Sequence, residues 1–477
     1  MLEVSENEIS ARLAGDNPWW SEVDNQPEVS TLKKRHYFQS FKTLVEQQEV
    51  NRAIILMGPR RVGKTVMLHQ LVHDLIAGGQ NPKSIIYAAI DTPTFSGIPL
   101  EKLIDIFCAR NEINKRKDKI FVLFDEIQYL KQWENHLKVL VDKFQNIKFV
   151  ASGSAAAALK LKSYESGAGR FSDFMLPPLT FAEYLHFIDK EKKLLTSKKT
   201  EDERYHYETP DINDLNKEFI NYVNFGGYPE AVFVDGVRDN PSRFIKSDII
   251  DKVLLRDLPS LYGIDDIQEL NRLFTSVAYN TGREISLKEL SSASGVASQT
   301  IKRYLEYLEA AFLISRVRRI DQHGKNFKRE RGFKVYLTNP SMRAALFQRA
   351  SEDSEFMGQL AETAIFSQWS HSRASQISYA RWDKGEVDIV GLDSLSMKPR
   401  WAVEVKWSDR FFDRPSELKS LFSFAHQNDL PKKDAGPILV TTRSKSGLKE
   451  CEGVPLQFVP TSLYCYAVGK NLTRRIW

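Results

Sequence analysis

The first part of this 477-residue chain contains three short, uninterrupted apolar runs, and a segment with helical periodicity follows the first of them. Residues 53–57, 120–124 and 147–151 are short apolar runs, which is the pattern of buried strands. After the first run a glycine pair, Gly78–Gly79, ends a segment whose apolar residues recur at helical spacing. These residues are Met67, Leu68, Leu71, Val72, Leu75 and Ile76. We therefore predict an α/β domain with a parallel sheet over residues 31–185.

The pattern changes beyond this domain and divides the chain into further segments. Trp19 and Trp20, within a polar and acidic N-terminal region, are expected to anchor that region onto the folded body. Residues 186–217 are rich in Lys, Glu and Asp and are expected to form a solvated surface. The remaining predicted segments are an acidic extension (1–30), a helical linker (186–280), a helix-turn-helix with a β-hairpin (281–345) and a second α/β region (346–477).

A glycine-rich loop joins the first strand to its helix and fits the pattern G-x-x-x-x-G-K-[ST]. Its residues are Gly58, Pro59, Arg60, Arg61, Val62, Gly63, Lys64 and Thr65. The glycines allow backbone N–H groups to close around phosphate oxygens, and the N-terminus of the helix adds positive potential. We predict that Lys64 reaches the β- and γ-phosphates and that Thr65 ligates Mg²⁺. A chance match would have to place a strand and a helix on the correct sides of the loop as well.

Two adjacent carboxylates, Asp125 and Glu126, follow the apolar run 120–124. We expect Asp125 in the Mg²⁺ coordination sphere and Glu126 as the group that orients and activates the attacking water, because phosphoryl transfer depends on positioning and charge neutralisation. The pair favours a hydrolase over a small-molecule kinase. The chain contains no N-K-x-D motif for reading guanine, so we predict ATP rather than GTP.

Polar residues after the next strand are further candidates, each with an ordinary alternative. Ser152 and Ser154 could contact the γ-phosphate or the attacking water, or could simply form a serine turn. Arg170 follows a glycine turn and could stabilise transition-state charge, in its own subunit or in a neighbouring one. A surface arginine is the alternative, and a role in a neighbouring subunit would require a homo-oligomer.

The segment 281–345 has the pattern of a helix-turn-helix. Ser286 and Ser298 are expected to cap two helices, with Gly295 in the turn between them. The second helix would bury one face and carry Gln299, Lys302 and Arg303 on the other, where such residues enter the major groove of DNA. A basic hairpin follows, with Arg316, Arg318, Arg319, Lys325, Lys328, Arg329 and Arg331. It could contact phosphates, and the alternative is a packing module with a solvated charged hairpin.

The last segment contains a set of carboxylates with one lysine. A turn and strand present Asp388, and a second strand carries Glu404-x-Lys406, whose two side chains share a face because strand side chains repeat with period two. We predict that Asp388 and Glu404 hold Mg²⁺ or Mn²⁺, and that Lys406 positions or activates a water. Glu362, on an upstream helix, could complete the metal shell.

Bulk properties restrict the partners only weakly. The net charge of +5 permits local basic surfaces without implying nucleic acid. Three scattered cysteines indicate neither a disulfide framework nor a zinc site, so a cytoplasmic location is expected. No apolar run approaches the roughly 20 residues of a membrane span.

Several motifs together resemble bacterial and archaeal AAA-family ATPases that carry a C-terminal domain of unknown function. They are the phosphate loop, Phe124-Asp125-Glu126-Ile127-Gln128, Ala151-Ser152-Gly153-Ser154, Ala168-Gly169-Arg170, the segment 178–184 and Gly226-Gly227-Tyr228-Pro229. The resemblance covers nearly the whole chain, with residues 1–30 and 186–217 least matched. It implies an ASCE-type P-loop core related to AAA+ and STAND ATPases, a winged helix and a restriction-endonuclease-like fold. The last segment resembles the PD-(D/E)xK nuclease core, although Val387 stands where the motif has proline.

Three functions fit these motifs. The first is an ATP-dependent or ATP-gated enzyme that cleaves or remodels DNA. The second is a STAND-like nucleotide switch in defence or regulation, opened by a protein or phage trigger, with a non-catalytic nuclease-like domain. The third is a DNA-binding regulator with an inactive nuclease fold, which the complete carboxylate–lysine set disfavours.

Overall fold

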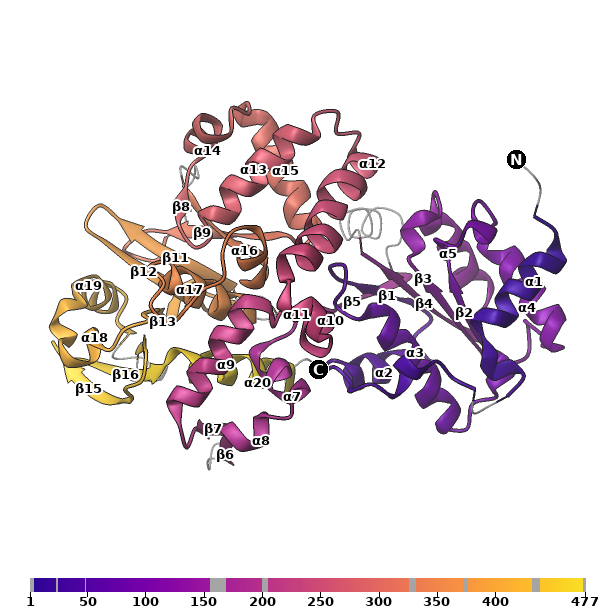
Figure 1. Cartoon of the computed structure of the whole chain (residues 1–477), viewed down its shortest axis with the longest axis horizontal. Helices are drawn as coiled ribbons and strands as arrows, with labels where there is room; N and C mark the ends of the chain where they lie inside the picture. The colour runs from indigo at the N-terminus through magenta and orange to yellow at the C-terminus, as the bar shows by residue number, and fades with distance from the viewer. Residues whose placement is uncertain are drawn as a thin grey trace. The chain divides into compact units, whose positions relative to one another are not determined.

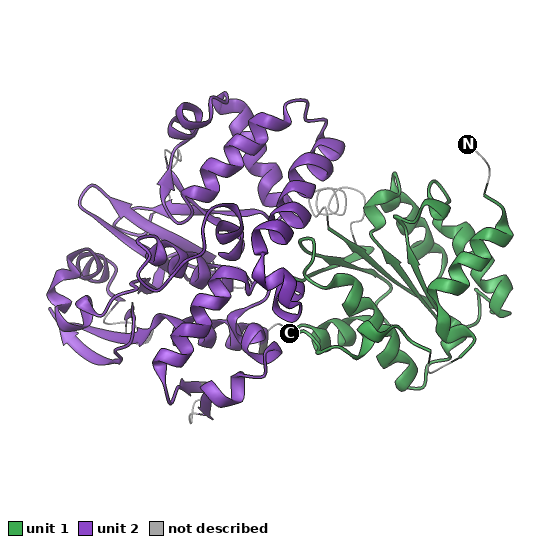
Figure 2. Ribbon diagram, in the orientation of Figure 1, with its two compact units in different colours: residues 1–177 green, residues 178–477 purple. Residues whose placement is uncertain are grey.

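The computed structural model describes residues 4–22, 25–47, 49–154, 169–199, 205–325, 332–369, 371, 376–430 and 438–474. The chain divides into two compact units, residues 1–177 and 178–477 (Figure 2). The helical linker, the helix-turn-helix and the second α/β region predicted from the sequence thus all lie in the second unit, and each unit is described by itself.

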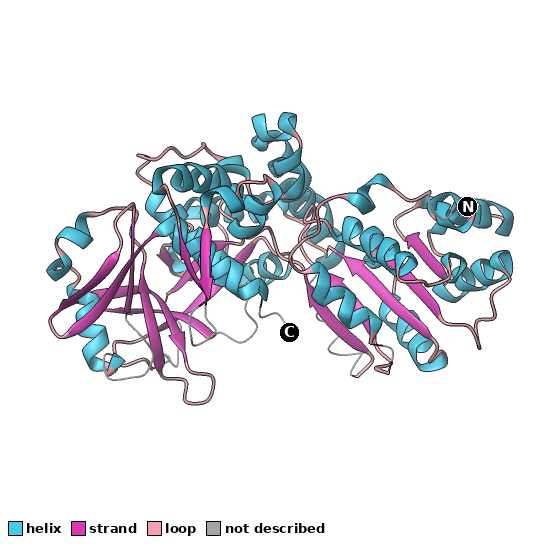
Figure 3. Ribbon diagram, turned by 90° about the horizontal axis from the view of Figure 1, so that it is seen from below, coloured by secondary structure: helices cyan, strands magenta, loops and turns pink. Residues whose placement is uncertain are grey.

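The first unit is built on a five-stranded sheet in the order β2-β3-β4-β1-β5, and every neighbouring pair is parallel (Figure 1). Its strands are β1 (Ala53–Met57), β2 (Ile85–Ala89), β3 (Ile120–Asp125), β4 (Ile147–Gly153) and β5 (Phe171–Met175). Helices cover both faces of the sheet (Figure 3), as a parallel sheet requires. They are α1 (Glu6–Asp16), α2 (Phe38–Glu46), α3 (Lys64–Ala77), α4 (Leu100–Asn111) and α5 (Trp133–Lys143). Short 3₁₀ turns connect them at Pro18–Trp20, Glu28–Thr31, Pro82–Ser84, Pro93–Phe95 and Ile127–Tyr129.

The N-terminal region is attached to the edge strand β2, as the tryptophan pair predicted. Trp19 and Trp20 are buried, and both indole N–H groups donate to the carbonyl oxygen of Ile85, at 3.2 and 2.7 Å. The Asn17 amide group donates to the Tyr87 carbonyl oxygen (2.8 Å) and accepts from the Tyr87 N–H (2.6 Å). These contacts satisfy polar backbone groups that an edge strand would otherwise expose.

Strand order decides which loops meet. Strand β4 lies between β1 and β3, and the register pairs Met57 with Gly153 and Phe124 with Ala151. The carboxyl ends of these parallel strands therefore bring together the phosphate loop, the Asp125–Glu126 pair and the serines at the end of β4. Arg170 precedes β5, whose first residue pairs with Ala53 at the start of β1. It therefore lies at the opposite end of the strands, where they begin.

The second unit contains a nine-stranded sheet in the order β15-β16-β14-β13-β12-β11-β9-β10-β8. Its strands are β8 (Glu284–Ile285), β9 (Ile314–Ile320), β10 (Phe333–Leu337), β11 (Gln376–Trp382), β12 (Gly385–Leu392), β13 (Pro399–Glu404), β14 (Ile438–Thr442), β15 (Gly447–Cys451) and β16 (Val454–Pro460). A separate hairpin pairs β6 (Thr196–Lys199) with β7 (Tyr205–Glu208). Strand β9 of the expected helix-turn-helix segment pairs in parallel with β11 of the expected C-terminal segment. The two segments thus share one sheet, which the sequence pattern did not indicate.

Helices of the second unit surround this sheet (Figure 1). They are α7 (Phe181–Phe187), α8 (Glu191–Leu194), α9 (Ile212–Phe225), α10 (Pro229–Phe233), α11 (Asp235–Asp239), the π-helical segments Ser242–Asp251 and Val253–Asp257, α12 (Leu258–Tyr262), α13 (Ile267–Tyr279), α14 (Leu287–Ser294), α15 (Ser298–Ala310), α16 (Ser341–Leu346), α17 (Met357–Trp369), α18 (Arg410–Asp413), the 3₁₀ turn Pro415–Glu417, α19 (Lys419–Gln427) and α20 (Thr461–Arg474). Apolar residues of α19, including Leu421 and Phe422, pack with Val387 and Val390 of β12 in one core. This core fixes β12, which carries Asp388. Within the described part of the chain, no helix is long and apolar enough to cross a membrane.

Candidate functional site

The phosphate loop is closely packed against the chain that follows β5. A Cβ atom on Gly58 would lie 2.1 Å from the Leu176 carbonyl oxygen, so only glycine fits there. Gly63 has a φ of 95°, in the left-handed region that favours glycine. The Lys64 ammonium donates to the carbonyl oxygens of Gly58 (3.0 Å) and Pro59 (2.8 Å). The two glycines therefore shape a loop that curves around the head of Lys64, as the motif predicts.

Arg35 holds the phosphate loop in place through hydrogen bonds to backbone carbonyl groups. The sequence patterns did not identify this residue. Its guanidinium group donates to the carbonyl oxygens of Val62 (2.8 Å) and Pro177 (2.9 Å), and the residue is only 6% exposed. It thus ties the phosphate loop to the end of the unit. A lone arginine in a polar stretch gave no signal, because its partners are backbone groups far away in the sequence.

An Arg35→Ala substitution is expected to weaken ATP binding about tenfold, since the loop loses the charge-assisted hydrogen bond at Val62 and with it the link through Arg35 to Pro177. Isothermal titration with a non-hydrolysable ATP analogue measures the effect. Arg52→Ala, which removes an exposed arginine of the same unit, is the matched control and should bind normally. Unchanged affinity in Arg35→Ala would show that the loop keeps its shape without this support.

Asp125 lies at the centre of a small hydrogen-bond network. Its carboxylate accepts from the Thr65 hydroxyl (2.7 Å), the Tyr87 hydroxyl (2.9 Å) and the Ser152 hydroxyl. Burial and the neighbouring Asp125 charge raise the pKa of Tyr87, so this phenol remains a donor. Thr65 and Asp125 are thus adjacent oxygen donors, a set that fits Mg²⁺. Tyr87 was not predicted, because tyrosine within a β-strand is common for packing reasons alone.

Glu126 is held directly beside this network. Its backbone is left-handed (φ 52°), and its carboxylate accepts from the Ser154 hydroxyl (3.2 Å) and from the Gln128 amide. The two serines therefore have different neighbours, since Ser152 contacts Asp125 and Ser154 contacts Glu126. Contact of either serine with a γ-phosphate remains a prediction.

Arg170 does not lie near the phosphate loop of its own subunit. It lies where the strands β1 and β5 begin, and its guanidinium group forms an ion pair with Asp142 at 3.0 Å. The expectation that it acts within its own subunit therefore does not fit this geometry, because the length of β1 separates the two. The role in a neighbouring subunit remains a prediction.

The expected DNA-contact residues have different surroundings. Gln299, Lys302 and Arg303 are exposed on α15, as predicted, and Arg318 is exposed on β9. Arg319 instead donates to the Arg381 carbonyl oxygen (3.0 Å) and pairs with Glu284 (3.4 Å), while Arg316 pairs with Glu309. Neither arginine is a free phosphate ligand, because acidic neighbours already engage it. Lys328, Arg329 and Arg331 lie outside the described residues.

The predicted caps of the two helices differ in outcome. Ser286 forms a capping box with Glu289, accepting from its N–H at 3.2 Å. Ser298 was expected to be a cap, but it is the first residue of α15, and Ala297 occupies the cap position without a side-chain bond.

The second unit brings Asp388, Glu404 and Lys406 together, as predicted. The register pairs Ile389 with Val403, so Asp388, in the middle of β12, and Glu404, the last residue of β13, are neighbours. The Lys406 ammonium lies 2.7 Å from a Glu404 oxygen and 3.7 Å from an Asp388 oxygen. Lys406 follows the end of the strand rather than lying within it, and the Thr441 hydroxyl accepts from its N–H (2.8 Å).

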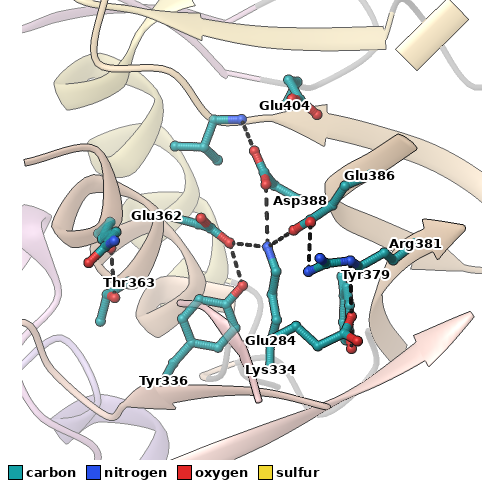
Figure 4. Close-up of polar contacts among 12 residues, drawn as sticks. Glu284, Lys334, Tyr336, Glu362, Thr363, Tyr379, Arg381, Glu386, Asp388 and Glu404 are labelled. Carbon is teal, nitrogen blue, oxygen red and sulfur yellow. Dashed lines mark hydrogen bonds and ion pairs between the residues drawn. The ribbon is translucent and has the colours of Figure 1, made fainter. Parts of the chain in front are cut away.

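Glu362 is near Asp388, but a second lysine lies between the two side chains (Figure 4). The Lys334 ammonium is 2.7 Å from Glu362, 2.6 Å from Glu386 and 3.3 Å from Asp388. Among the described residues, Glu362, Asp388 and Glu404 do not form a group whose ligand atoms all lie within 4.8 Å of one another. The expectation that Glu362 completes a metal shell with the other two is therefore corrected, because Lys334 already neutralises that side.

Burial and charge shift the pKa values of this cluster in opposite directions. Burial, and for Glu404 the neighbouring Asp388 charge, raise the pKa of Glu362 and of Glu404 to about 7. Burial alone would also raise the pKa of Asp388, but the Lys406 and Lys334 ammonium groups outweigh it and lower that pKa. Burial alone would lower the pKa of both lysines, but the surrounding carboxylates raise it. Asp388 is thus the permanent anion, and Glu404 is ready to gain or lose a proton near neutrality.

The Asp388–Glu404 side fits a divalent cation. Among the described residues, the Glu404 Oε2 atom is buried without a hydrogen-bond partner, while Asp388 Oδ2 accepts from the Val405 N–H (2.9 Å) and faces Lys406. A buried carboxylate oxygen without a partner is costly, and a hard cation with oxygen ligands would satisfy it.

We expect the metal-free protein to lose stability as the pH rises from about 4.5 to about 7. In this range the folded state keeps protons on Glu362 and Glu404 that the unfolded chain has already released. The stabilising contribution of these two groups is therefore fully present below their pKa in the unfolded chain, and it is lost as the pH rises to their pKa in the folded protein. Glu404→Gln should remove part of this loss and raise stability at pH 8 by about 1–3 kcal/mol. Calorimetry in EDTA at pH 5 and pH 8 tests this. A pH-independent wild type would contradict the raised pKa values.

Similarity to other proteins agrees with the first of these sites. Residues 50–185 match the family described as an AAA domain, and residues 216–353 match a domain of unknown function, DUF8612. An uncharacterized protein of Haemophilus influenzae is 23% identical over 421 residues, which cover 86% of this chain and 93% of that protein. An uncharacterized protein of Methanocaldococcus jannaschii is 27% identical over 269 residues, or 55% of this chain, which spans 56% of that relative. A Walker-type ATPase of Pyrococcus abyssi aligns over 67% of this chain and 99% of its own, with 14% identity and a TM-score of 0.39.

The AAA-domain match and the geometry around Lys64, Thr65 and Asp125 define the class of the first unit. It carries a P-loop ATPase domain of the AAA type, on the parallel sheet that the sequence predicted. This class binds a nucleotide, typically with Mg²⁺. The match over residues 216–353 names neither a winged helix nor a nuclease fold, so both remain predictions.

Proposed function

We propose that this protein hydrolyses Mg²⁺-ATP in its first unit and cleaves DNA in its second, with ATP turnover controlling cleavage. The observation that carries the second part is the arrangement of Lys406 beside Glu404 and Asp388. Metal-dependent hydrolysis of a phosphodiester needs carboxylates that hold a cation and a positive group beside them. Asp388 and Glu404 are the carboxylates here, and Lys406 provides the ammonium group.

Within the ATPase site, each residue has a distinct role. Lys64 binds the β- and γ-phosphates, and Thr65 with Asp125 provides the oxygen atoms for Mg²⁺. Glu126 orients the attacking water and takes its proton as the bond from the γ-phosphorus to the bridging oxygen breaks. Ser154 and Gln128, which bond to the Glu126 carboxylate, set the direction of that group.

Within the nuclease site, Asp388 and Glu404 would hold a divalent cation, which supplies charge stabilisation for the phosphate under attack. Lys406 positions the attacking water and stabilises the negative charge that develops on phosphorus-bound oxygen. The water oxygen forms a new bond to phosphorus, the bond to one ester oxygen breaks, and that oxygen takes up a proton. The attacking water would release its proton to solvent, because Asp388 and Glu404 would be engaged with the cation.

The helices around residues 287–310 support DNA as the partner. The order α13, β8, α14, α15, β9, β10 is that of a winged helix, and α15 exposes Gln299, Lys302 and Arg303 on one face. A helix with this polar face suits the major groove. The exposed Arg318 on β9 adds a phosphate contact that carries no sequence information.

A nucleotide switch with a non-catalytic second unit is the other candidate, and one observation favours it. Lys334 already balances part of the carboxylate charge, so the cluster can be stable as a purely structural ion-pair network. Such a switch would turn over ATP slowly, retain nucleotide tightly and not respond to bare DNA.

The decisive experiment incubates the protein with Mg²⁺ or Mn²⁺ and labelled single-stranded, duplex or forked DNA, with and without ATP. Cleavage that disappears in Lys406→Ala supports the nuclease, and a Lys64→Ala variant shows whether ATP controls it. ATP hydrolysis without cleavage of any DNA would overturn the nuclease proposal in favour of the switch.

A further inference from the structure

Lys334 is the least expected charge in the second unit. It is the second residue of β10, a strand of otherwise uncharged residues, and its side chain is only 2% exposed. Side chains alternate along a strand, so Lys334 and Tyr336 point to the same side of β10. Both reach Glu362 of α17, at 2.7 Å from the ammonium group and 2.6 Å from the phenol. Figure 4 shows the two side chains converging on this carboxylate.

The ammonium group of Lys334 is surrounded as a metal ion would be. Glu362, Glu386 and Asp388 each place one oxygen within 3.3 Å of it, and they come from α17 and from alternate positions of β12. An ammonium group has three donors and no acceptor, so three carboxylates saturate it. Burial of a lysine is otherwise costly, and here the anions around it compensate.

Charge balance limits how many further cations the cluster can take. Glu386 is also paired with Arg381 at 3.3 Å, so the charges of these two groups cancel. The charges that remain to be balanced are those of three carboxylates and two ammonium groups, namely Glu362, Asp388, Glu404, Lys334 and Lys406. These groups carry a small excess of negative charge, which a single divalent ion more than balances. A second divalent ion would leave a buried cluster strongly positive, which is unfavourable.

We propose that Lys334 is a built-in cation that takes the place of a second divalent metal, so that the site loads one divalent ion, at Asp388 and Glu404. This deepens the proposed nuclease function and rests on it for its biological meaning. Two-metal phosphodiesterases place their ions about 3.5–4 Å apart on shared carboxylates. Here Asp388 is the shared carboxylate, with one oxygen toward Lys334 and the other toward Lys406 and the Val405 N–H.

Manganese binding tests the proposal without any need for nuclease activity. Isothermal titration uses nucleotide-free, full-length protein in an Asp125→Asn background, which removes a metal ligand of the ATPase site. The parent should bind one Mn²⁺, and Lys334→Met should bind two, because three carboxylates lose their cation. Lys398→Met removes an exposed lysine between β12 and β13 and should match the parent. Adding Glu362→Gln to Lys334→Met should return the count to one.

The outcomes separate this proposal from the proposed function. A parent that binds no Mn²⁺ while Lys334→Met gains one ion would support the role of Lys334 and count against the nuclease. Equal counts in the parent and in Lys334→Met would overturn the role of Lys334. Should Lys334→Met fail to fold, electron paramagnetic resonance of the Mn²⁺-loaded parent decides. The proposal expects the spectrum of isolated ions, and a spin-coupled pair would overturn it.

Discussion

A Glu126→Gln variant is expected to bind Mg²⁺-ATP with normal affinity and to hydrolyse it about 100-fold to 10,000-fold more slowly than the parent protein. The amide keeps the size of the side chain and its hydrogen bonds with Ser154 and Gln128, but it cannot take a proton from the attacking water. Lys64 and Thr65, which are predicted to bind the phosphates and Mg²⁺, are unchanged. A steady-state phosphate-release assay and a nucleotide titration measure the two quantities separately.

Glu112→Gln, which changes an exposed glutamate of the same unit, is the matched control for this loss. It should hydrolyse ATP at the parental rate. Parental turnover in Glu126→Gln as well would remove Glu126 from the catalytic role and leave Asp125 as the only essential carboxylate near the loop. A loss of nucleotide binding would instead show that Glu126 shapes the phosphate loop.

A Lys406→Ala variant is expected to lose metal-dependent DNA cleavage by about 100-fold or more, while ATP hydrolysis without DNA stays at the parental rate. The substitution removes the ammonium group that lies beside both Asp388 and Glu404, and with it the proposed positioning of water and charge stabilisation. Divalent-metal binding should persist or tighten, since both carboxylates remain and lose a competing cation. Cleavage of labelled DNA and Mn²⁺ titration give the two readouts.

Lys384→Ala, which changes an exposed lysine in the turn between β11 and β12, should cleave like the parent. Thermal melting of both variants excludes a general loss of folding as the cause. Undiminished cleavage in Lys406→Ala would place the activity outside this site. Glu404→Gln provides a second variant, because it removes a proposed metal ligand and should abolish cleavage by a different route.

The local patterns of the first unit predicted its core accurately. Strand β1, helix α3 and the loop between them occur where apolar runs, helical spacing and glycines placed them, since these signals act over a few neighbouring residues. The position of Asp125 followed from the same logic. The surroundings of the site did not, because Arg35 and Tyr87 act through partners that the sheet brings close.

The second unit shows the limits of pattern reading more clearly. Asp388, Glu404 and Lys406 could be predicted because two adjacent strands carry them at fixed spacing. Lys334 stood in the sequence as a charged residue within an apolar strand, which was a usable signal. Its proposed role depends on the pairing of β9 with β11, which joins the segment 281–345 to the sheet of Asp388.

The sequence by itself determined strands β1, β3 and β4 of the ATPase domain, the helix α3, the nucleotide-binding loop and the residues at the ends of β3 and β4. These features depend on local periodicity and on motifs whose chemistry requires a fixed spacing. Only the tertiary structure decided that Arg170 lies away from its own phosphate loop and that Lys334, rather than a metal ion, bridges Glu362 and Asp388. Strand order and register bring these groups together or keep them apart, and both are set by packing between segments distant in the chain.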